Sequence, residues 1–394
     1  MIELLAPCHN FSTLNVAIKA GANAVYFGIN SLNMRMNAKN FKISDLKKIV
    51  KICRESKVKS YLTLNSIVYE NEIKKAEKII KKSKQSGVNA IIINDLGLIE
   101  ILKKNKMEFH VSTQASVTNS KSCNLYKKLG AKRVILAREV SLKDLKKIVK
   151  NSKVDLEVFI HWAMCVSISG RCFLSGAIYQ KSANRGECMQ PCRQEWNIKN
   201  KNGELIIKNQ RFLNAKDLCT ISFLDKIIKT GVKSLKIEGR MNDANYVSTV
   251  VSVYRQAIDN FDKKKVYEWS RQLENVYHRG FSTGFYLKKP DAKDIELNSE
   301  GSVSRIKKVS LGVVKNYYKK IKVVEILLNH KGLKLGDNII IQGKTTYIKQ
   351  KVKSIQIHKV EVKKAKKGQR VAVRIDEKDA VARKNDLIFK LENI

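Results

Sequence analysis

Four of the eight cysteines lie between residues 165 and 192. Six residues separate Cys165 from Cys172, and three separate Cys188 from Cys192. Thiolates bind soft cations such as zinc, or the irons of an iron-sulfur cluster, in preference to hard cations. The crowding therefore predicts a metal centre that is held by these four side chains.

The spacing favours an iron-sulfur cluster over zinc. A structural zinc site usually carries two short C-x(2-4)-C knuckles, and only the second pair of cysteines has that spacing. A [4Fe-4S] cluster is a larger body, so it tolerates wider and unequal spacings. Zinc, and unliganded or disulfide-bonded cysteines, are the alternatives. Disulfides are disfavoured because no charged and apolar export leader follows Met1, so a cytoplasmic location with reduced thiols is expected.

The elements that must position these cysteines follow a repeating pattern. Short apolar runs alternate with stretches of helical periodicity, which is typical of parallel strands joined by helices. Eight such units predict a (β/α)8 barrel, with an open doubly wound sheet as the alternative. No Gly-rich phosphate turn follows the first run, so dinucleotide binding is not expected. The expected strands are residues 2–6, 24–27, 59–64, 90–93, 108–111, 134–137, 156–160 and 234–237, and a further helix is expected at 218–230.

Polar side chains are dense just after these apolar runs and rare inside them. In a barrel, the loops at the carboxyl ends of the strands form the site, so these residues predict one polar pocket, with the cysteine window as part of its roof. For any single residue, a helix cap or a surface loop is the competing interpretation. The residues are Asn30, Arg35, Asn37, Asn65, Asn94, Asp95, Ser112, Gln114, Arg138, Glu139, His161, Glu238 and Arg240.

The charge and the last part of the chain suggest a polyanionic partner. The chain has 77 Lys and Arg against 36 Asp and Glu, a net charge of +41. Phosphate neutralisation supplies much of the affinity for nucleic acids, although a solvated basic surface is the alternative. Residues 1–285 are expected to form the barrel domain and 286–308 a linker. In residues 309–394, short alternating runs and tight turns predict a small β-barrel that resembles the second domain of translation GTPases. No apolar run has the length that crosses a bilayer, so no membrane partner is expected.

Several blocks of sequence resemble the collagenase-like peptidase family U-32. The resemblance covers most of the chain to about residue 285 and includes the Gly170-Arg171-Cys172 block. It is nearest to the branch that hydroxylates the wobble uridine of certain tRNAs to 5-hydroxyuridine in a prephenate-dependent reaction. Other blocks that carry it are Ile2-Glu-Leu-Leu-Ala-Pro7, Ala22-Asn-Ala-Val-Tyr-Phe-Gly28, Cys188-Met-Gln-Pro-Cys192-Arg193, Ser234-Leu-Lys-Ile-Glu-Gly-Arg240 and His278-Arg-Gly280.

The resemblance implies a cofactor, a co-substrate and a partner. It implies a [4Fe-4S] cluster on the four cysteines, prephenate as a small dicarboxylate co-substrate, and tRNA as the macromolecular substrate. Arginine grips carboxylates in a bidentate manner, which makes three arginines at strand ends the expected carboxylate partners. An ion pair of Arg240 with one of the two glutamates is the competing structural interpretation. The expected catalytic set is Arg35, Arg138, Glu139, Glu238 and Arg240.

Three other functions remain open at the level of the sequence. A peptidase is one, because Gly280-Phe-Ser282-Thr-Gly284 matches G-x-S-x-G. The match is weak, since a nucleophile elbow requires a strand before the serine and a helix after it, and a helical stretch precedes this one. No HExxH motif occurs. An rRNA hydroxylase and a non-catalytic, zinc-stabilised RNA-binding protein are the other two.

Overall fold

The structure is a computed structural model, and it describes residues 2–168, 171–299, 301–377 and 380–394, without the side chain of Trp162. Gly170 of the Gly170-Arg171-Cys172 block lies outside the described residues. The chain divides into two compact units. The first comprises Met1–His9, Ala17–Asn242 and Tyr246–Val303, and the second comprises Asn10–Val16, Asp243–Asn245 and Ser304–Ile394.

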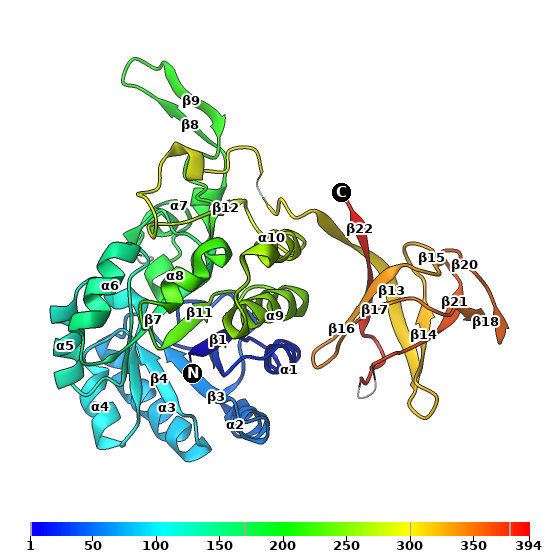
Figure 1. Cartoon of the computed structure of the whole chain (residues 1–394), viewed down its shortest axis with the longest axis horizontal. Coiled ribbons are helices and arrows are strands. Elements are labelled where there is room, and N and C mark those ends of the chain that lie inside the picture. Colours follow the sequence, from blue (N-terminus) through cyan, green and yellow to red (C-terminus); the bar gives the residue numbers. More distant parts are fainter. Residues whose placement is uncertain (1, 169–170, 300, 378–379) are drawn as a thin grey trace. The chain divides into compact units, whose positions relative to one another are not determined.

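Eight parallel strands close into a barrel in the first unit (Figure 1). Each strand pairs with the next along the chain, and the last, β11, pairs with both β7 and β1, which completes the ring. Most of these strands are buried along their whole length, as expected for parallel strands covered by helices. The predicted (β/α)8 fold is confirmed. The strands are β1 (Glu3–Pro7), β2 (Ala24–Phe27), β3 (Lys59–Leu64), β4 (Ala90–Ile93), β5 (Phe109–Val111), β6 (Arg133–Ile135), β7 (Asp155–Ala163) and β11 (Ser234–Ile237).

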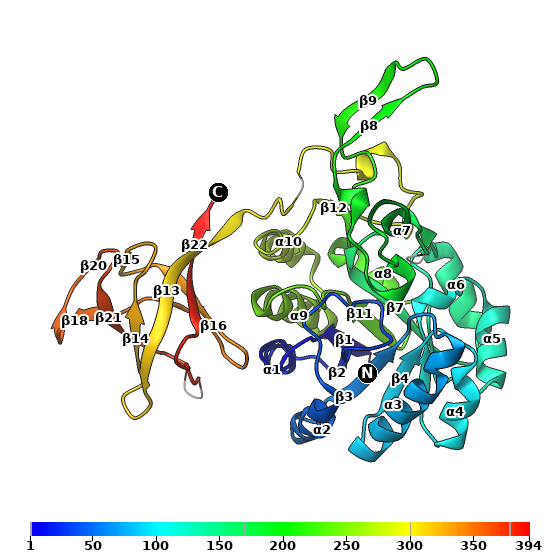
Figure 2. The same cartoon turned by 180° about the vertical axis from the view of Figure 1, so that it is seen from behind.

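Amphipathic helices cover the outside of the barrel (Figure 2). In α2, for example, Leu46, Ile49, Val50 and Cys53 are buried while the lysines between them face solvent. In the part of the chain that the structure describes, no helix is long and apolar enough to span a membrane. The helices are α1 (Phe11–Lys19), α2 (Leu46–Glu55), α3 (Ile73–Ser86), α4 (Leu98–Lys104), α5 (Ser120–Lys128), α6 (Leu142–Asn151), α8 (Leu224–Ile228), α9 (Ala244–Asp259) and α10 (Val266–Glu274).

The helix predicted over residues 218–230 is wrong at its beginning. Asp217–Cys219 forms a strand, β10, which pairs antiparallel with β7 and parallel with the short strand β12 (Phe281–Ser282). The helix α8 starts only at Leu224. Pairing with β7 buries all three residues of β10, and this tertiary contact outweighs their helical periodicity.

The cysteine window fills the connection between β7 and β10. It contains the short helix α7 (Leu174–Tyr179) and two single 3-10 turns, Ala183–Arg185 and Pro191–Arg193. A hairpin follows, formed by β8 (Trp196–Lys199) and β9 (Leu205–Gln210), and it projects from the rest of the first unit (Figure 1). The long connection places all four cysteines on the carboxyl side of the barrel strands, because it departs from the end of β7.

The second unit is an antiparallel sheet around its own apolar core. The sheet follows the order β17-β16-β22-β13-β14-β21-β18-β19, beside a two-stranded ribbon of β15 and β20. Its first strand begins within the segment expected as a linker. After β17 ends at Lys351, the chain turns inward and buries Val352 and Ile355. The strands are β13 (Ile306–Tyr318), β14 (Val323–Leu327), β15 (Leu333–Lys334), β16 (Asn338–Gln342), β17 (Tyr347–Lys351), β18 (Gln356–Ile357), β19 (Val360–Glu361), β20 (Lys364–Ala365), β21 (Arg370–Arg374) and β22 (Leu387–Asn393).

Candidate functional site

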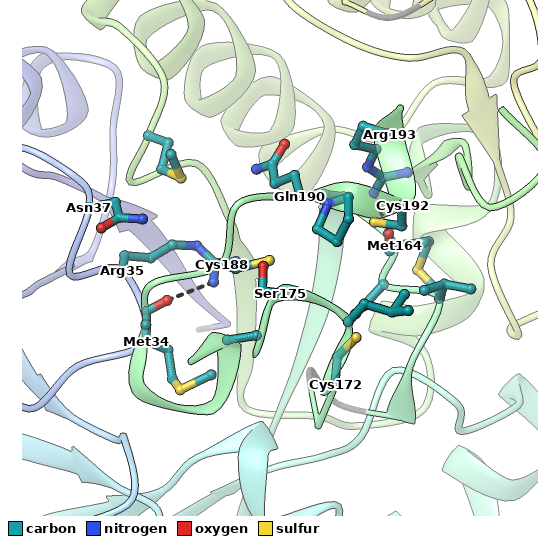
Figure 3. Close-up of a pocket in the computed structure, with 18 of the residues that line it drawn as sticks. Met34, Arg35, Asn37, Met164, Cys172, Ser175, Cys188, Gln190, Cys192 and Arg193 are labelled. Carbon is teal, nitrogen blue, oxygen red and sulfur yellow. Dashed lines mark hydrogen bonds between the residues drawn. The ribbon is translucent and has the colours of Figure 1, made fainter. Parts of the chain in front are cut away.

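All four clustered cysteines line one pocket at the carboxyl ends of the barrel strands (Figure 3). The same pocket is lined by three of the charged residues that the sequence placed after strands. These are Arg35 from the connection after β2, Arg138 after β6 and Glu238 after β11. Loops that are far apart in sequence therefore meet at one place, where thiols lie beside a mixed set of charges.

The cysteine sulfurs are free thiols, and local backbone contacts fix their loops. The Ser167 amide donates to the Sγ atom of Cys165 at 3.4 Å, and the Cys172 amide donates to Oδ1 of Asn184 at 3.2 Å. Gly186 has a φ of +88°, and a side chain there would collide with the carbonyl oxygen of Asn33. A glycine at this position therefore allows the loop that carries Cys188 to lie directly against the connection after β2.

The electrostatics of Cys192 show that several thiols share one environment. Burial raises the pKa of the Cys192 thiol, and the neighbouring Cys165 and Cys188 raise it further, while Arg193 and Arg279 oppose the shift. Ionising several of these thiols together is costly unless a cation compensates the charge. Within the described ranges, however, no three His, Cys, Asp or Glu side chains are grouped so that they could hold a single metal ion.

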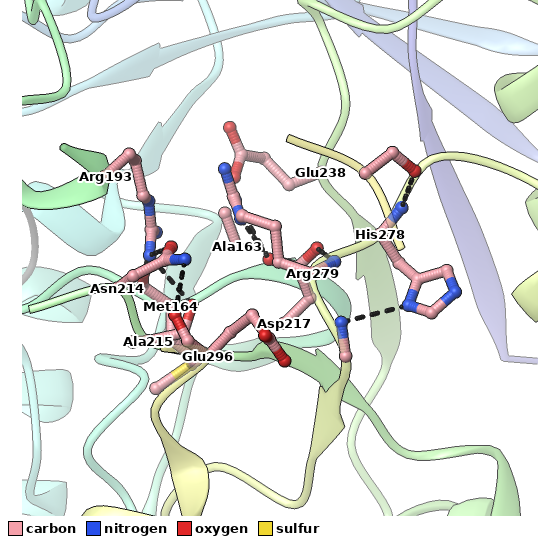
Figure 4. Close-up of polar contacts among 12 residues, drawn as sticks. Ala163, Met164, Arg193, Asn214, Ala215, Asp217, Glu238, His278, Arg279 and Glu296 are labelled. Carbon is pink, nitrogen blue, oxygen red and sulfur yellow. Dashed lines mark hydrogen bonds and ion pairs between the residues drawn. The ribbon is translucent and has the colours of Figure 1, made fainter. Parts of the chain in front are cut away.

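Arg193 joins the two halves of the cysteine window (Figure 4). Its buried guanidinium donates to the carbonyl oxygen of Met164 at 2.7 Å, to Oδ1 of Asn214 at 2.9 Å and to the carbonyl oxygen of Ala215 at 2.8 Å. Arg193 directly follows Cys192, and Met164 directly precedes Cys165. The guanidinium therefore fixes the distance between a cysteine of each pair. In the sequence, the only signal for this role is the position of Arg193 in the Cys-Met-Gln-Pro-Cys-Arg block.

A buried ion pair supports the same wall of the pocket. Asp217 in β10 accepts hydrogen bonds from Nε and NH2 of Arg279 at 3.2 and 2.9 Å and from the Arg279 amide at 3.0 Å. Both side chains are almost fully buried, and Arg279 lines the pocket. Asp217 thus holds a pocket arginine in place through three hydrogen bonds.

Glu238 lies between two arginines. It accepts from Nε of Arg35 at 3.1 Å and from a terminal nitrogen of the same guanidinium, and its Oε2 atom lies 3.8 Å from NH2 of Arg138. Oε2 is buried and accepts no hydrogen bond from the described residues. The Glu238 carboxylate raises the pKa of Arg35, with a smaller contribution from Cys188. Two guanidiniums against one carboxylate leave an excess of one positive charge beside the thiols.

Arg138 is held by its surroundings without a close ion pair. Its NH1 atom donates to the carbonyl oxygen of Ala163 at 2.8 Å, and its guanidinium lies 4.7 Å from the centre of the Phe159 ring. The side chain is 12% exposed. Arg138 therefore keeps donor capacity directed at the pocket while its position is fixed at the end of β7.

Eight of the thirteen residues expected at the pocket do not line it, namely Asn30, Asn65, Asn94, Asp95, Ser112, Glu139, His161 and Arg240. Arg240 does not line the pocket, because it is buried beside Tyr26 and donates to Oδ1 of Asn33 at 3.1 Å. Burial lowers its pKa to about 10. Glu139 is half-buried and also lies outside the lining residues. His161 is buried in the wall of the barrel, where its Nδ1 atom lies 3.2 Å from the hydroxyl of Tyr254 and burial lowers its pKa to about 3.

A second set of charged side chains lies inside the barrel. It was not predicted from the sequence, because its members lie within strands or at their first residues. Lys236 lies 3.1 Å from Glu157, and Arg133 forms ion pairs with both Glu157 and Glu3. Two basic and two acidic groups compensate one another, as buried charges require. None of them lines the cysteine pocket, so this network serves the closure of the barrel.

The serine motif does not form a nucleophile elbow. Ser282 ends the two-residue strand β12, and a turn follows it in the structure. Its Oγ atom accepts from the Gly284 amide at 3.3 Å, while the ring of the nearby His278 stacks on Phe281 and its Nδ1 atom accepts from the Gly280 amide. A serine hydrolase needs the serine at a strand-to-helix turn with a histidine directed at it, and neither feature is formed here.

Comparison with known proteins places this geometry in a family. The family model described as peptidase family U32 matches residues 9–296. The chain belongs to peptidase family U32. The resemblance noted from the sequence blocks is thereby confirmed, and the match covers the barrel after β1 together with the cysteine window.

Relatives of this U32 chain carry names of two kinds. It is 40% identical to an uncharacterized protease of Methanocaldococcus jannaschii, over 100% of this chain and 98% of that protein. It is 36% identical to a collagenase of Porphyromonas gingivalis, over 99% of this chain and 98% of the other. It is 33% identical to tRNA hydroxylation protein P1 of Bacillus subtilis, over 86% of this chain and 83% of the other. Both kinds of name support an enzyme. The geometry of the site is the evidence for choosing between proteolysis and RNA modification.

Proposed function

We propose that this U32 protein is an iron-sulfur-dependent RNA hydroxylase that converts the wobble uridine of tRNA to 5-hydroxyuridine in a prephenate-dependent reaction. The observation that carries the proposal is the meeting of Cys165, Cys172, Cys188 and Cys192 with Arg35, Arg138 and Glu238 in one pocket. The similarity to a relative named as a tRNA hydroxylation protein supports it.

The four cysteines would hold a [4Fe-4S] cluster. A structural zinc site usually carries two short C-x(2-4)-C knuckles, and only Cys188 and Cys192 have that spacing. A cluster distributes its ligands over four irons, so the wider spacing of Cys165 and Cys172 suits it better. When bound, such a cluster supplies a redox-active iron centre. The charges of Arg193 and Arg279 oppose the rise in the pKa of the Cys192 thiol, in the direction that ligation by a thiolate requires, and the Ser167 amide donates a hydrogen bond to the sulfur of Cys165.

Arg35 and Arg138 would bind the dicarboxylate. Glu238 neutralises one of the two guanidiniums, which leaves the pocket with an unbalanced positive charge. A carboxylate that enters the pocket compensates this charge, and the planar donor fork of Arg138 suits bidentate binding. Glu238 orients Arg35 and presents a buried oxygen atom, Oε2, which can accept a proton or a hydrogen bond from a bound hydroxyl group.

The RNA would be attracted by the basic surface of the chain. Residues 304–394 alone contain 24 Lys and Arg against eight Asp and Glu. Such an excess supports phosphate binding, and binding of this kind weakens steeply as salt is added.

Nucleoside analysis of a deletion strain tests the proposal. Mass spectrometry of digested tRNA should show that 5-hydroxyuridine is lost in the strain without this gene and restored by the wild-type gene, and anaerobically purified protein should contain about four irons per chain. Ribosomal RNA from the same strains is digested in parallel, since a change confined to rRNA would assign the other RNA substrate. Unchanged nucleosides in both RNAs would refute the proposed function.

A further inference from the structure

A second hollow adjoins the cysteine pocket. The two hollows share Met34 and Gln114 as lining residues. The tripeptide Arg171-Cys172-Phe173 forms the wall between them, since Cys172 lines the first hollow while Arg171 and Phe173 line the second. A group held in the second hollow is therefore one residue away from the proposed cluster ligand.

Phe173 is unusually open to solvent for a large aromatic side chain. It is 81% exposed, although it stands at the N-terminal end of α7 beside residues that are partly buried. Its ring therefore contributes little to the core. An exposed aromatic face next to a hollow is the usual platform for stacking an unpaired nucleobase.

Side-chain amides with unused hydrogen-bonding capacity line the same hollow. Asn94 follows β4, and Gln114 follows β5, and neither side-chain amide has a hydrogen-bond partner among the described residues. Asn184 accepts from the Cys172 amide through Oδ1, and its NH2 group has no partner in the described chain. Amide groups offer both donors and acceptors, which is what the edge of a pyrimidine requires.

Arg171 adds a positive charge at the rim of this hollow. One of its terminal nitrogens donates to the carbonyl oxygen of Gln114 at 3.1 Å, and the side chain is otherwise exposed. A guanidinium placed in this way can bind a backbone phosphate of an RNA strand while the base turns inward.

We infer that the second hollow binds a nucleobase unstacked from an RNA strand. Phe173 stacks on the face of the base, Asn94 and Gln114 bind its edge, and Arg171 binds the adjoining phosphate. The inference rests on the proposed function for the identity of the ligand, and it adds the residues that hold the base beside the cysteine pocket. Enzymes that modify a base commonly extrude it from its stack in this way.

Binding and crosslinking test the inference independently of the reaction. The probe is an RNA hairpin with the anticodon-loop length of tRNA and 5-iodouridine at the wobble position. Stacking on an aromatic side chain predicts that Phe173→Ala weakens binding about tenfold, whereas Phe173→Trp stays within about twofold of wild type. The control is Tyr267→Ala, which removes an aromatic side chain that is 71% exposed on α10. Light-induced crosslinks in the wild-type protein should map to the peptide that contains Phe173.

Each outcome separates the inference from the proposed function. Crosslinks outside the second hollow, together with unchanged affinity in Phe173→Ala, would overturn the inference even if the deletion strain lacks 5-hydroxyuridine. Crosslinks at Phe173 with normal nucleosides in the deletion strain would support the base site and refute the reaction. If Phe173→Ala loses iron because Cys172 is disturbed, the RNA affinity of the Asn94→Ala variant becomes the test of the inference, since Asn94 lies on another loop. Normal RNA affinity in an iron-replete Asn94→Ala protein would then count against the inference.

Discussion

The guanidinium of Arg193 donates a 2.7 Å hydrogen bond to the carbonyl oxygen of Met164, so the residue after the last clustered cysteine is tied to the residue before the first. We expect Arg193→Lys to lose this connection, because one ammonium group cannot reproduce three hydrogen bonds in a plane. Iron per chain after anaerobic purification should fall to less than about half of wild type. Arg255→Lys, in an ion pair on α9, is the matched control and should keep its iron. Full iron retention in both variants would show that the two cysteine loops are held without Arg193.

The cysteines themselves give a sharper test of the metal centre. Replacing any one of Cys165, Cys172, Cys188 and Cys192 by Ala should remove most of the iron and the absorbance near about 400 nm that iron-sulfur proteins show. Cys53→Ala is the control, since Cys53 is buried in α2 away from the pocket and should cost stability only. A Cys188→Ala protein that retained all of its iron would remove this residue from the ligand set.

Arg138 and Arg240 should respond differently to substitution by lysine. Arg138 faces the pocket, so Arg138→Lys should leave the melting temperature and the iron content near wild type while 5-hydroxyuridine in cells drops at least about tenfold, or roughly 1.4 kcal/mol. Arg240 is 3% exposed and bound to Asn33, so Arg240→Lys should lower the melting temperature by several degrees. A stable but inactive Arg240→Lys protein would instead show that Arg240 acts in the site.

Lysines around β20 should contribute to RNA affinity through phosphates. Lys363, Lys364, Lys366 and Lys367 are all exposed on the second unit. Changing the four to Glu should weaken tRNA binding and make the slope of log K against log salt concentration less steep. The control makes the same charge change at four exposed lysines of α3, namely Lys74, Lys75, Lys78 and Lys82. Equal losses in both variants would mean that net charge, and not this part of the second unit, determines binding.

The barrel could be read from the sequence because its strands are buried on both sides. The expected runs 24–27, 59–64, 90–93 and 234–237 coincide with β2, β3, β4 and β11, since short, mainly apolar runs that alternate with helical stretches are typical of parallel strands. The strand β10 was not predicted because its partners, β7 and β12, are distant in sequence, and no local sequence pattern predicts such a pairing. Tertiary pairing of this kind overrides local periodicity.

The site was only partly predictable, for a related reason. The types and crowding of the cysteines are visible in the sequence, whereas the hydrogen bonds that hold them join Arg193 to residues on two other segments. The burial of Arg240 depends on contacts with Asn33 and Tyr26, which belong to other parts of the chain. Glu238 therefore lines the pocket, whereas Arg240, two residues further along the chain, does not.

His161 should make the stability of the protein depend on pH. Burial, aided by the neighbouring His278, lowers its pKa from 6.5 to about 3, so the unfolded chain binds a proton below pH 6.5 that the folded chain does not. Stability contributed by the neutral ring is complete above pH 6.5 and is lost as the pH falls toward 3. Between pH 7 and pH 5 this amounts to about 2 kcal/mol.

The variant His161→Asn isolates this contribution, because asparagine does not titrate and all other groups remain. Denaturant unfolding at pH 7 and pH 5 gives the loss of stability for each protein, and wild type should lose about 2 kcal/mol more than the variant. Cys219→Ala is the control, since Cys219 is also buried against Tyr254 but stays protonated throughout this range. It should lower the stability by a similar amount at both pH values and keep the wild-type slope. If His161→Asn and wild type lose the same amount, the ring is not held neutral by its burial in β7, and the acid sensitivity arises elsewhere.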